Sequence, residues 1–203
     1  MTIQEVYETM NTNPIAPFSI DFDLLTGACK SGKAEPTRRY VSNMVKQFNN
    51  TAAAERIVAE GNPLLYEFYE LNQIPETAGD LKFGTTVLYP GKVGDEYYMT
   101  KGHFHTILDT SEVYYALSGQ GCMLMETPEG EVALLEMKPG EAVYVPPRWA
   151  HRTINTGDVP MVFFYAFRSD AGHDYGTIEQ KGYRKLVVDR DGKPTMIDHP
   201  RWA

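Results

Sequence analysis

Three histidines and one glutamate in this chain are spaced so that they can hold a metal ion. His103 and His105 are one residue apart, Glu112 follows soon after, and His151 lies further along the chain. Side chains two positions apart point to the same face of a β-strand, so we expect both imidazoles to point the same way. We expect Glu112 to begin the next strand and His151 to open a later one. In a small barrel, these faces can converge on one interior point.

The donor set of this group indicates which metals it prefers. Three imidazoles and one carboxylate suit a divalent ion such as Fe(II), Mn(II), Zn(II) or Ni(II). Four protein ligands leave up to two positions of an octahedron for substrate or water. The chain has five histidines, and this group uses three of them. The spacing therefore predicts a metalloenzyme that binds one divalent ion per subunit.

The second half of the chain reads as a series of short strands. Turns that contain Gly or Pro separate most of the runs, and this spacing predicts an antiparallel sandwich or barrel. The runs rich in β-branched, aromatic and other apolar residues are 85–89, 113–117, 123–125, 132–135, 142–145 and 161–165. Asp191-Gly192 predicts a late hairpin between Lys185–Val188 and Thr195–Ile197.

Helical signals are confined to the first part of the chain. Residues 1–13 have an apolar face at helical spacing, and a second helix is expected from Asn50 or Thr51 to about Glu60, with Gly61 as its stop. Residues 14–50 are mixed, and the type of Leu64–Leu71 stays open. We expect a helical extension over residues 1–15 and a single domain with helical and strand arms over residues 16–203.

Size, charge and cysteine content exclude several classes of partner. A chain of 203 residues can bury a substantial core, and a net charge of -8 argues against nucleic acid or an anionic membrane as the main partner. Cys29 and Cys122 are far apart and form no CxxC motif, which favours a reducing, cytoplasmic location. The start of the chain has no apolar run typical of a signal peptide, and no apolar stretch is long enough for a membrane span.

Two motifs resemble those of the cupin family. His103, His105, Glu112 and Gly119 match the first cupin motif, and the second motif is matched by Gly140, Pro146, His151 and Asn155. The chain departs from the pattern twice, because the gap between His105 and Glu112 is longer than usual and Arg148 stands where many cupins have Gly. The resemblance implies a mainly β cupin fold, that is, a double-stranded β-helix or jelly-roll barrel, with a few peripheral helices.

Two longer sequence segments resemble one subfamily of cupins. Thr100-Lys-Gly-His-Phe-His and Asp170-Ala-Gly-His-Asp-Tyr-Gly-Thr-Ile are similar to segments of the cupin-type, or archaeal-type, glucose-6-phosphate isomerases, and the similarity extends over about residues 16–203. This implies interconversion of glucose 6-phosphate and fructose 6-phosphate in glycolysis and gluconeogenesis. It also implies metal ligation by His103, His105, Glu112 and His151, with Fe(II) favoured and Mn, Zn or Ni possible.

The same resemblance assigns roles to residues outside the metal group. It implies substrate contacts from Tyr66, Thr86, Thr100 and Gly102, whose hydroxyls and exposed amide can donate to phosphate oxygens. It implies catalytic contacts from Glu112, His173 and Tyr175. Phe167 stands where some relatives have Tyr. Lys101 and the pair Arg38-Arg39 are local positive charges, and we expect Arg39 to be an ordinary solvated surface residue.

The mechanism and two rival functions stay open at the level of sequence. Glu112 can act as the base of a cis-enediol path or remain a metal ligand while hydride shifts between carbons. An Fe(II) cupin dioxygenase would use the same ligand set, and a non-catalytic cupin would bind a sugar phosphate without turning it over. We expect a homodimer, because pairing of edge strands between subunits and two-fold symmetry are common.

Overall fold

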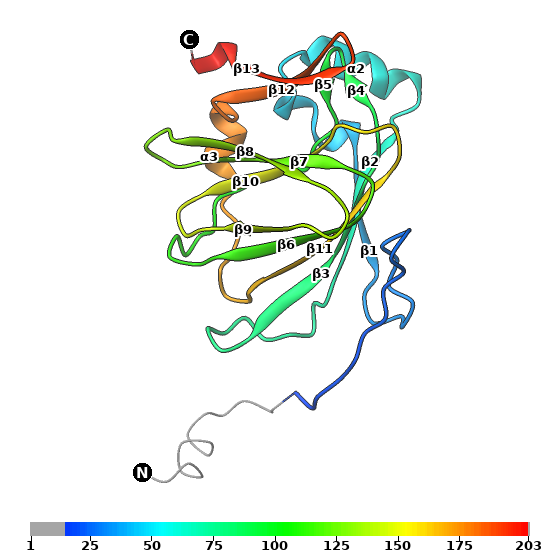
Figure 1. Ribbon diagram of the computed structural model, residues 1–203, viewed down its shortest axis with the longest axis vertical. Helices are drawn as coiled ribbons and strands as arrows, with labels where there is room; N and C mark the ends of the chain where they lie inside the picture. Colours follow the sequence, from blue (N-terminus) through cyan, green and yellow to red (C-terminus); the bar gives the residue numbers. More distant parts are fainter. Residues whose placement is uncertain (1–14, 203) are drawn as a thin grey trace.

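The computed structural model describes residues 15–202, and in them antiparallel β-strands dominate. The six-stranded sheet has the order β1 (Pro36–Tyr40), β2 (Leu64–Glu70), β3 (Leu81–Leu88), β11 (Met161–Arg168), β6 (Glu112–Ser118) and β9 (Ala142–Val145). Facing it is a sheet of β10 (Ala150–Asn155), β7 (Gly121–Glu126) and β8 (Val132–Met137) (Figure 1). The predicted mainly β, jelly-roll architecture is confirmed.

Alternation of side chains explains why one face of each strand turns inward. In β6, Glu112, Tyr114 and Ala116 are buried, whereas Val113 and Tyr115 between them are exposed. This period of two is the pattern expected of a strand that covers a core on one side and meets solvent on the other. The six predicted strand runs lie in strands of these two sheets, except that the run 85–89 extends one residue past the end of β3, so the sequence pattern located the strands correctly.

The strand register of the six-stranded sheet aligns side chains of neighbouring strands in rows across the inner surface of the sheet. Phe68 lies opposite Thr86, which in turn lies opposite Phe163. Further along β11, Tyr165 lies opposite Tyr114 of β6, and Phe167 lies opposite Glu112. Residues far apart in sequence thereby come to share one concave face.

A four-stranded sheet and helix α2 (Thr51–Glu60) lie at one end of the barrel (Figure 1). The sheet consists of β13 (Lys193–Asp198), β12 (Lys185–Arg190), β5 (Glu96–Tyr97) and β4 (Lys92–Val93). The β12–β13 hairpin was predicted, and its turn residues Asp191 and Gly192 have φ of 54° and 77°, as a type I′ turn requires.

The predicted ends of α2 are confirmed. The side chain of Asn50 accepts a hydrogen bond from the N–H of Ala53, and Gly61 follows the last helical residue. The predicted helix over residues 1–13 lies outside the described residues. The remaining helical segments, which the sequence patterns did not predict, are α3 (Gly176–Lys181) and the short 3-10 turns η1 (Val41–Asn43), η2 (Val45–Gln47) and η3 (Pro200–Trp202).

Two segments left open by the sequence contain strands, and the predicted strand at His103 and His105 was wrong. Leu64–Leu71, whose type was open, contains β2, and the mixed segment 14–50 contains β1. His103 and His105 do not lie on a regular strand: His103 makes a single antiparallel bridge to His151, and His105 follows in an irregular segment. In residues 15–202, no helix is long and apolar enough to cross a membrane.

Candidate metal centre and substrate cavity

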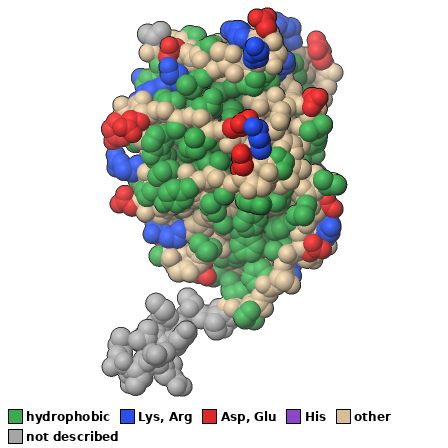
Figure 2. All heavy atoms as spheres, viewed as in Figure 1, with side chains coloured by type: hydrophobic (Ala, Val, Ile, Leu, Met, Phe, Trp, Pro, Cys, Tyr) green, Lys and Arg blue, Asp and Glu red, His purple; other side chains and the backbone are tan. Residues whose placement is uncertain are grey.

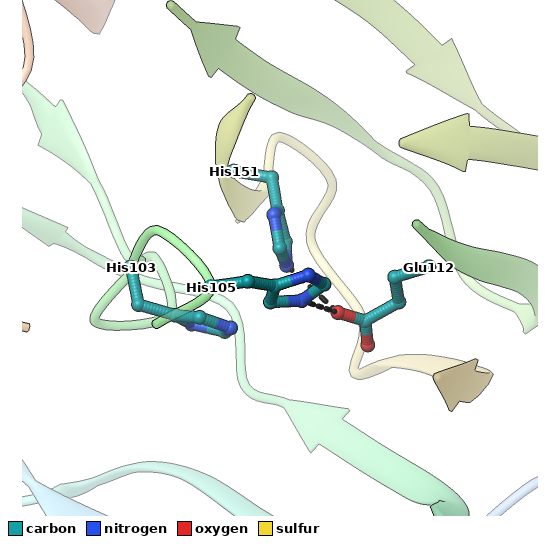
Figure 3. A group of neighbouring side chains, drawn as sticks. All are labelled: His103, His105, Glu112 and His151. Atoms are coloured by element: carbon teal, nitrogen blue, oxygen red, sulfur yellow. Dashed lines mark hydrogen bonds and ion pairs between the residues drawn. The ribbon is translucent and has the colours of Figure 1, made fainter. Parts of the chain in front are cut away.

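The four predicted ligands come together in the interior of the barrel. Each offers one donor atom, and these atoms lie within 4.8 Å of one another. His151 comes from β10 and Glu112 from the first residue of β6, so the six-stranded and the three-stranded sheet each supply one candidate ligand. His103 and His105 reach the same point from the segment that joins β5 to β6 (Figure 3).

Two of the imidazoles are turned so that one ring nitrogen faces the group and the other faces the backbone. His105 Nδ1 lies 3.2 Å from the carbonyl oxygen of Thr110, and His151 Nδ1 lies 3.3 Å from that of Trp149. A ring N–H that donates to a carbonyl fixes the tautomer and leaves Nε2 as a lone-pair donor. This is the arrangement expected of metal-ligating histidines.

The Nε2 atoms converge on Glu112. His105 Nε2 lies 3.1 Å and His151 Nε2 lies 3.0 Å from the same carboxylate oxygen (Figure 3). At His151 the distance is short, but the direction does not satisfy a hydrogen bond, and Nε2 of both His103 and His151 is buried without a hydrogen-bond partner. Buried polar atoms are rarely left unpaired, so these orphaned nitrogens fit a bound cation.

The protonation states also suit a cation. Burial raises the pKa of Glu112, but its close contacts with His151 and His105 more than offset this and lower it to about 2. Burial and the neighbouring imidazoles lower the pKa of His103 well below its usual value. At neutral pH, Glu112 is therefore an anion and His103 is neutral, the forms in which both bind metals.

A cavity of about 190 Å³ opens onto this group. It contains every substrate-contact residue predicted from the sequence, namely Tyr66, Thr86, Thr100 and Gly102. Of the predicted ligands, His103, Glu112 and His151 line it, whereas His105 does not. Its remaining lining residues are Phe68, Glu70, Lys101, Tyr114, Phe163, Tyr165, Phe167, His173 and Tyr175.

His173 and Tyr175 form the wall next to His103. The rings of His173 and Tyr175 are stacked with centroids 5.8 Å apart, and the His173 ring centroid lies 4.3 Å from that of His103. Burial lowers the pKa of His173 to about 4 and raises that of Tyr175 to about 12. At neutral pH the imidazole is thus neutral and the phenol protonated, so both can exchange hydrogen bonds with a neutral sugar.

Glu70 and Tyr165 are cavity residues that the sequence reasoning did not identify. The Tyr165 hydroxyl donates to Glu70 Oε2 at 3.0 Å. Burial raises the pKa of Glu70, although the hydrogen bond from Tyr165 opposes this. The period-two spacing of Tyr66, Phe68 and Glu70 was the available signal, because it places all three on one face once β2 is recognised as a strand.

Arg39, which was expected to be an ordinary solvated residue, is half-buried. It lies opposite Tyr66 in the register of β1 and β2, and its guanidinium is 6.0 Å from the ring centroid of Phe68. Directly opposite residues of an antiparallel pair share a face, so Arg39 stands beside the cavity wall. Its neighbour Arg38 lies opposite Glu67 and forms an ion pair with it at 3.0 Å.

The two departures from the cupin motifs are accommodated locally. Arg148 has a φ of 72°, which explains why Gly is common at this position, and its guanidinium pairs with Glu129 at 2.6 Å. The extra length between His105 and Glu112 forms a loop in which Thr110 Oγ1 lies 2.7 Å from His105 Nδ1. Phe167 is buried with its ring centroid 5.3 Å from that of His173.

Comparison with known proteins shows which family the chain belongs to. A sequence model of the family described as "Glucose-6-phosphate isomerase (GPI)" matches residues 39–202. The chain is 52% identical to a glucose-6-phosphate isomerase of Thermococcus litoralis over 92% of this chain and 96% of that protein. It is 48% identical to the one from Pyrococcus furiosus over 92% and 97% of the two chains. A relative from Sinorhizobium medicae is 36% identical over 94% and 90%.

Among solved structures, oxalate decarboxylase of Bacillus subtilis overlaps with a TM-score of 0.41 and 24% identity over 52% of this chain and 26% of that chain. This overlap is too limited to bear on function. The family match and the near full-length relatives are sufficient: this chain belongs to the glucose-6-phosphate isomerase family and is an aldose–ketose isomerase.

Proposed function

We propose that this chain interconverts glucose 6-phosphate and fructose 6-phosphate with the help of one divalent metal ion per subunit, Fe(II) being favoured. The ligands would be His103, His105, Glu112 and His151. The observation that carries the proposal is that the buried, partly unpaired donors of this group open onto the cavity that also contains the predicted phosphate contacts. One end of the cavity suits an anion and the other a polarisable carbonyl.

The phosphate would be held at the end of the cavity formed by β2, β3 and the segment around Thr100. Thr86 and Thr100 offer hydroxyls, Tyr66 a phenol and Gly102 a backbone amide, and all four line the cavity. Hydrogen bonds to an anionic acceptor are stronger than those between neutral groups, so a few such donors can fix the substrate. The sugar would then extend towards Glu112 and His103.

The reaction moves a hydrogen between C1 and C2 of the open-chain sugar. A divalent ion at the four ligands would act as a Lewis acid towards the sugar carbonyl. In the proton-transfer path, the Glu112 carboxylate takes the C2 proton of the aldose while O1 gains a proton, and an enediol forms. Glu112 then gives a proton to C1 while O2 loses its own, and the proton held by Glu112 can exchange with solvent in between. In the alternative path, Glu112 remains a ligand and the hydrogen passes from C2 to C1 with its electron pair. Hydrogen exchange with solvent distinguishes the two.

His173 and Tyr175 would orient the sugar next to the reacting carbons. The neutral imidazole can accept a proton from one sugar hydroxyl and return it to the ring oxygen, which opens the pyranose. The Tyr175 phenol, whose pKa is raised to about 12, remains a hydrogen-bond donor throughout. Because both rings stack on one another, the orientation of one depends on the other.

The test is conversion of fructose 6-phosphate under argon, before and after treatment with EDTA. We expect activity without oxygen, loss of activity with EDTA, and recovery with Fe(II), Mn(II), Zn(II) or Ni(II). The ratio of recovered activities identifies the preferred ion. Oxygen consumption coupled to turnover would instead indicate a dioxygenase. Full activity in the EDTA-treated, metal-free protein would contradict metal dependence but not isomerase activity.

We also propose that the protein is a homodimer. The outer face of β6 and β9 exposes Val113, Tyr115 and Tyr144, and Val113 lies directly opposite Tyr144. Hydrophobic side chains also gather over the barrel strands on the face drawn in Figure 2. Exposed apolar patches commonly mark contacts between subunits. Sedimentation at micromolar concentration should give twice the chain mass of 22.9 kDa, and a monomer would contradict the proposal.

A further inference from the structure

The cavity wall formed by residues 100–102 is a bulge beside β10. Isolated antiparallel bridges pair Met99 with Ile154 and His103 with His151. Three residues lie between these bridges on one side but only two on the β10 side, so the longer segment must bow away from the ladder. Thr100 N–H still donates to the Thr153 carbonyl at 2.9 Å, and the 100–102 bulge leaves the Gly102 N–H outside the ladder.

Gly102 gives the bulge its shape. Its φ is +73°, and a Cβ there would lie 2.6 Å from the Tyr183 hydroxyl and 3.0 Å from Arg152 Cβ. Only glycine avoids both the strained backbone and these contacts. Within residues 15–202, the Gly102 N–H takes part in no hydrogen bond, and the residue lines the cavity. The amide is thus available to an anion.

Arg152 lies opposite the bulge and holds it from behind. Its Nη2 donates to the carbonyl of Lys101 at 2.6 Å, and its Nη1 lies 2.9 Å from Met99 Sδ. The guanidinium carbon is 4.4 Å from the ring centroid of Tyr183. Arg152 is only 2% exposed, and its guanidinium gives the Lys101 carbonyl a buried hydrogen-bond donor. Removing it would leave the Lys101 carbonyl without its partner.

The charge of Arg152 is not neutralised by a contacting carboxylate. Among the residues the structure describes, Glu96 and Glu126 act on it through space, without forming an ion pair, and its Nε is buried without a hydrogen-bond partner. A buried charge without a counter-charge is unfavourable. Arginine stays protonated in such surroundings, because its usual pKa is very high. The fixed positive charge directly behind the 100–102 bulge is therefore matched to an anion on the cavity side.

We propose that Arg152 is a positioning residue for the phosphate of the substrate. It holds the 100–102 bulge in the shape that presents Gly102 N–H and Thr100 to the phosphate, and it adds a buried positive charge behind them. The inference rests on the proposed function, since it requires the phosphate to lie at this end of the cavity. In this role, Arg152 does not contact the reacting carbons.

The experiment compares the wild type with Arg152→Lys, Arg152→Gln and Arg184→Gln as metal-loaded proteins. For each, KM and kcat for fructose 6-phosphate and the inhibition constant of inorganic phosphate are measured, together with bound metal. Arg184 is the matched control, because it also stacks on an aromatic ring, that of Trp202 at 4.2 Å, and pairs with Glu126, but it does not line the cavity.

We expect R152Q to raise both KM and the phosphate inhibition constant about tenfold or more, since hydrogen bonds involving charged groups have effects of this size. Bound metal should remain, and kcat should change much less than KM. R152K keeps a charge but lacks the planar fork, so its constants should lie between those of the wild type and R152Q. R184Q should leave them unchanged, even where its melting temperature falls. If R152Q does not fold, R152K and R184Q still provide the comparison.

Unchanged KM and phosphate inhibition in R152Q or R152K would overturn the role of Arg152, as would equal effects of the Arg152 and Arg184 variants. Loss of metal with no change in KM would also overturn it, because the residue would then serve the neighbouring His151. A wild-type protein that does not convert fructose 6-phosphate would contradict the proposed function instead. The two failures are therefore distinguishable.

Discussion

His103 and His151 face each other across an isolated antiparallel bridge. The N–H of His151 donates to the carbonyl of His103 at 3.1 Å, the reciprocal bond is 3.4 Å long, and the ring centroids are 4.5 Å apart. The bridge joins the two motifs of the sequence through their backbones. Main-chain hydrogen bonds therefore fix the positions of these two candidate ligands, which is the kind of preorganisation that a metal site needs.

Substitution of a ligand should remove metal and activity together. We expect His103→Ala to lose most bound metal, and with it the conversion of fructose 6-phosphate. In the wild type, excess metal should raise the melting temperature, since an ion at about 100 times its Kd stabilises a fold by about 2.7 kcal/mol. The variant should lack this response. His199→Ala, at a buried histidine outside the ligand group, is the control and should retain the metal. Full activity in H103A would show that the site is wrong.

Substitution of His173 should separate chemistry from metal binding. His173 stacks with Tyr175 and contacts His103 but is not one of the four converging ligands. We expect His173→Gln to keep its metal and lower kcat roughly 10²-fold, the usual scale for loss of an acid–base group. Metal analysis and steady-state kinetics on the same preparation test this. An unchanged kcat would argue that the ring only packs.

The two adjacent arginines of β1 should differ in their effect on substrate binding. Arg39 stands on the cavity side opposite Tyr66, whereas Arg38 is engaged by Glu67. We expect Arg39→Ala to raise KM for fructose 6-phosphate several-fold at low salt, and the difference should shrink as the Debye length falls from about 30 Å at 0.01 M to about 8 Å at 0.15 M salt. Arg38→Ala should leave KM near that of the wild type. Equal KM values for the two variants would contradict the assignment.

Glu96 should make the folded protein less stable as the pH rises. Burial raises its pKa from 4.5 to about 7, although the N–H of Asn49 donates to its Oε2 at 2.9 Å and opposes this. Below pH 4.5 the carboxyl is protonated in both the folded and the unfolded states. Between 4.5 and about 7 only the unfolded chain ionises, so stability falls with pH, in total by on the order of 3 kcal/mol.

Glu96→Gln should remove this decline. Urea denaturation at pH 5 and pH 8 measures it, with the exposed Glu131→Gln as control. We expect the E131Q protein to behave as the wild type does, and the E96Q protein to lose less stability between the two pH values. The same pH dependence in E96Q and the wild type would mean that another group is responsible.

Local sequence patterns were sufficient for the repeating parts of this protein. The alternation in β6 located that strand, Asn50 and Gly61 marked the ends of α2, and Asp191-Gly192 located the late hairpin. Each depends on neighbours within a few residues, whose propensities the sequence contains directly. The residue types and spacing of the candidate metal ligands also predicted the group that the structure brings together.

What depends on contacts between distant segments was decided only by the tertiary structure. The sequence predicted His103 and His105 on a regular strand, but the bridge to His151 fixes their backbone instead. Arg39 looked like a solvated charge until the β1–β2 register placed it opposite Tyr66, and Arg152 gave no signal until the 100–102 bulge lay beside it. The physical reason is that strand register and bulges follow from how distant segments pack and pair, and no local propensity encodes them.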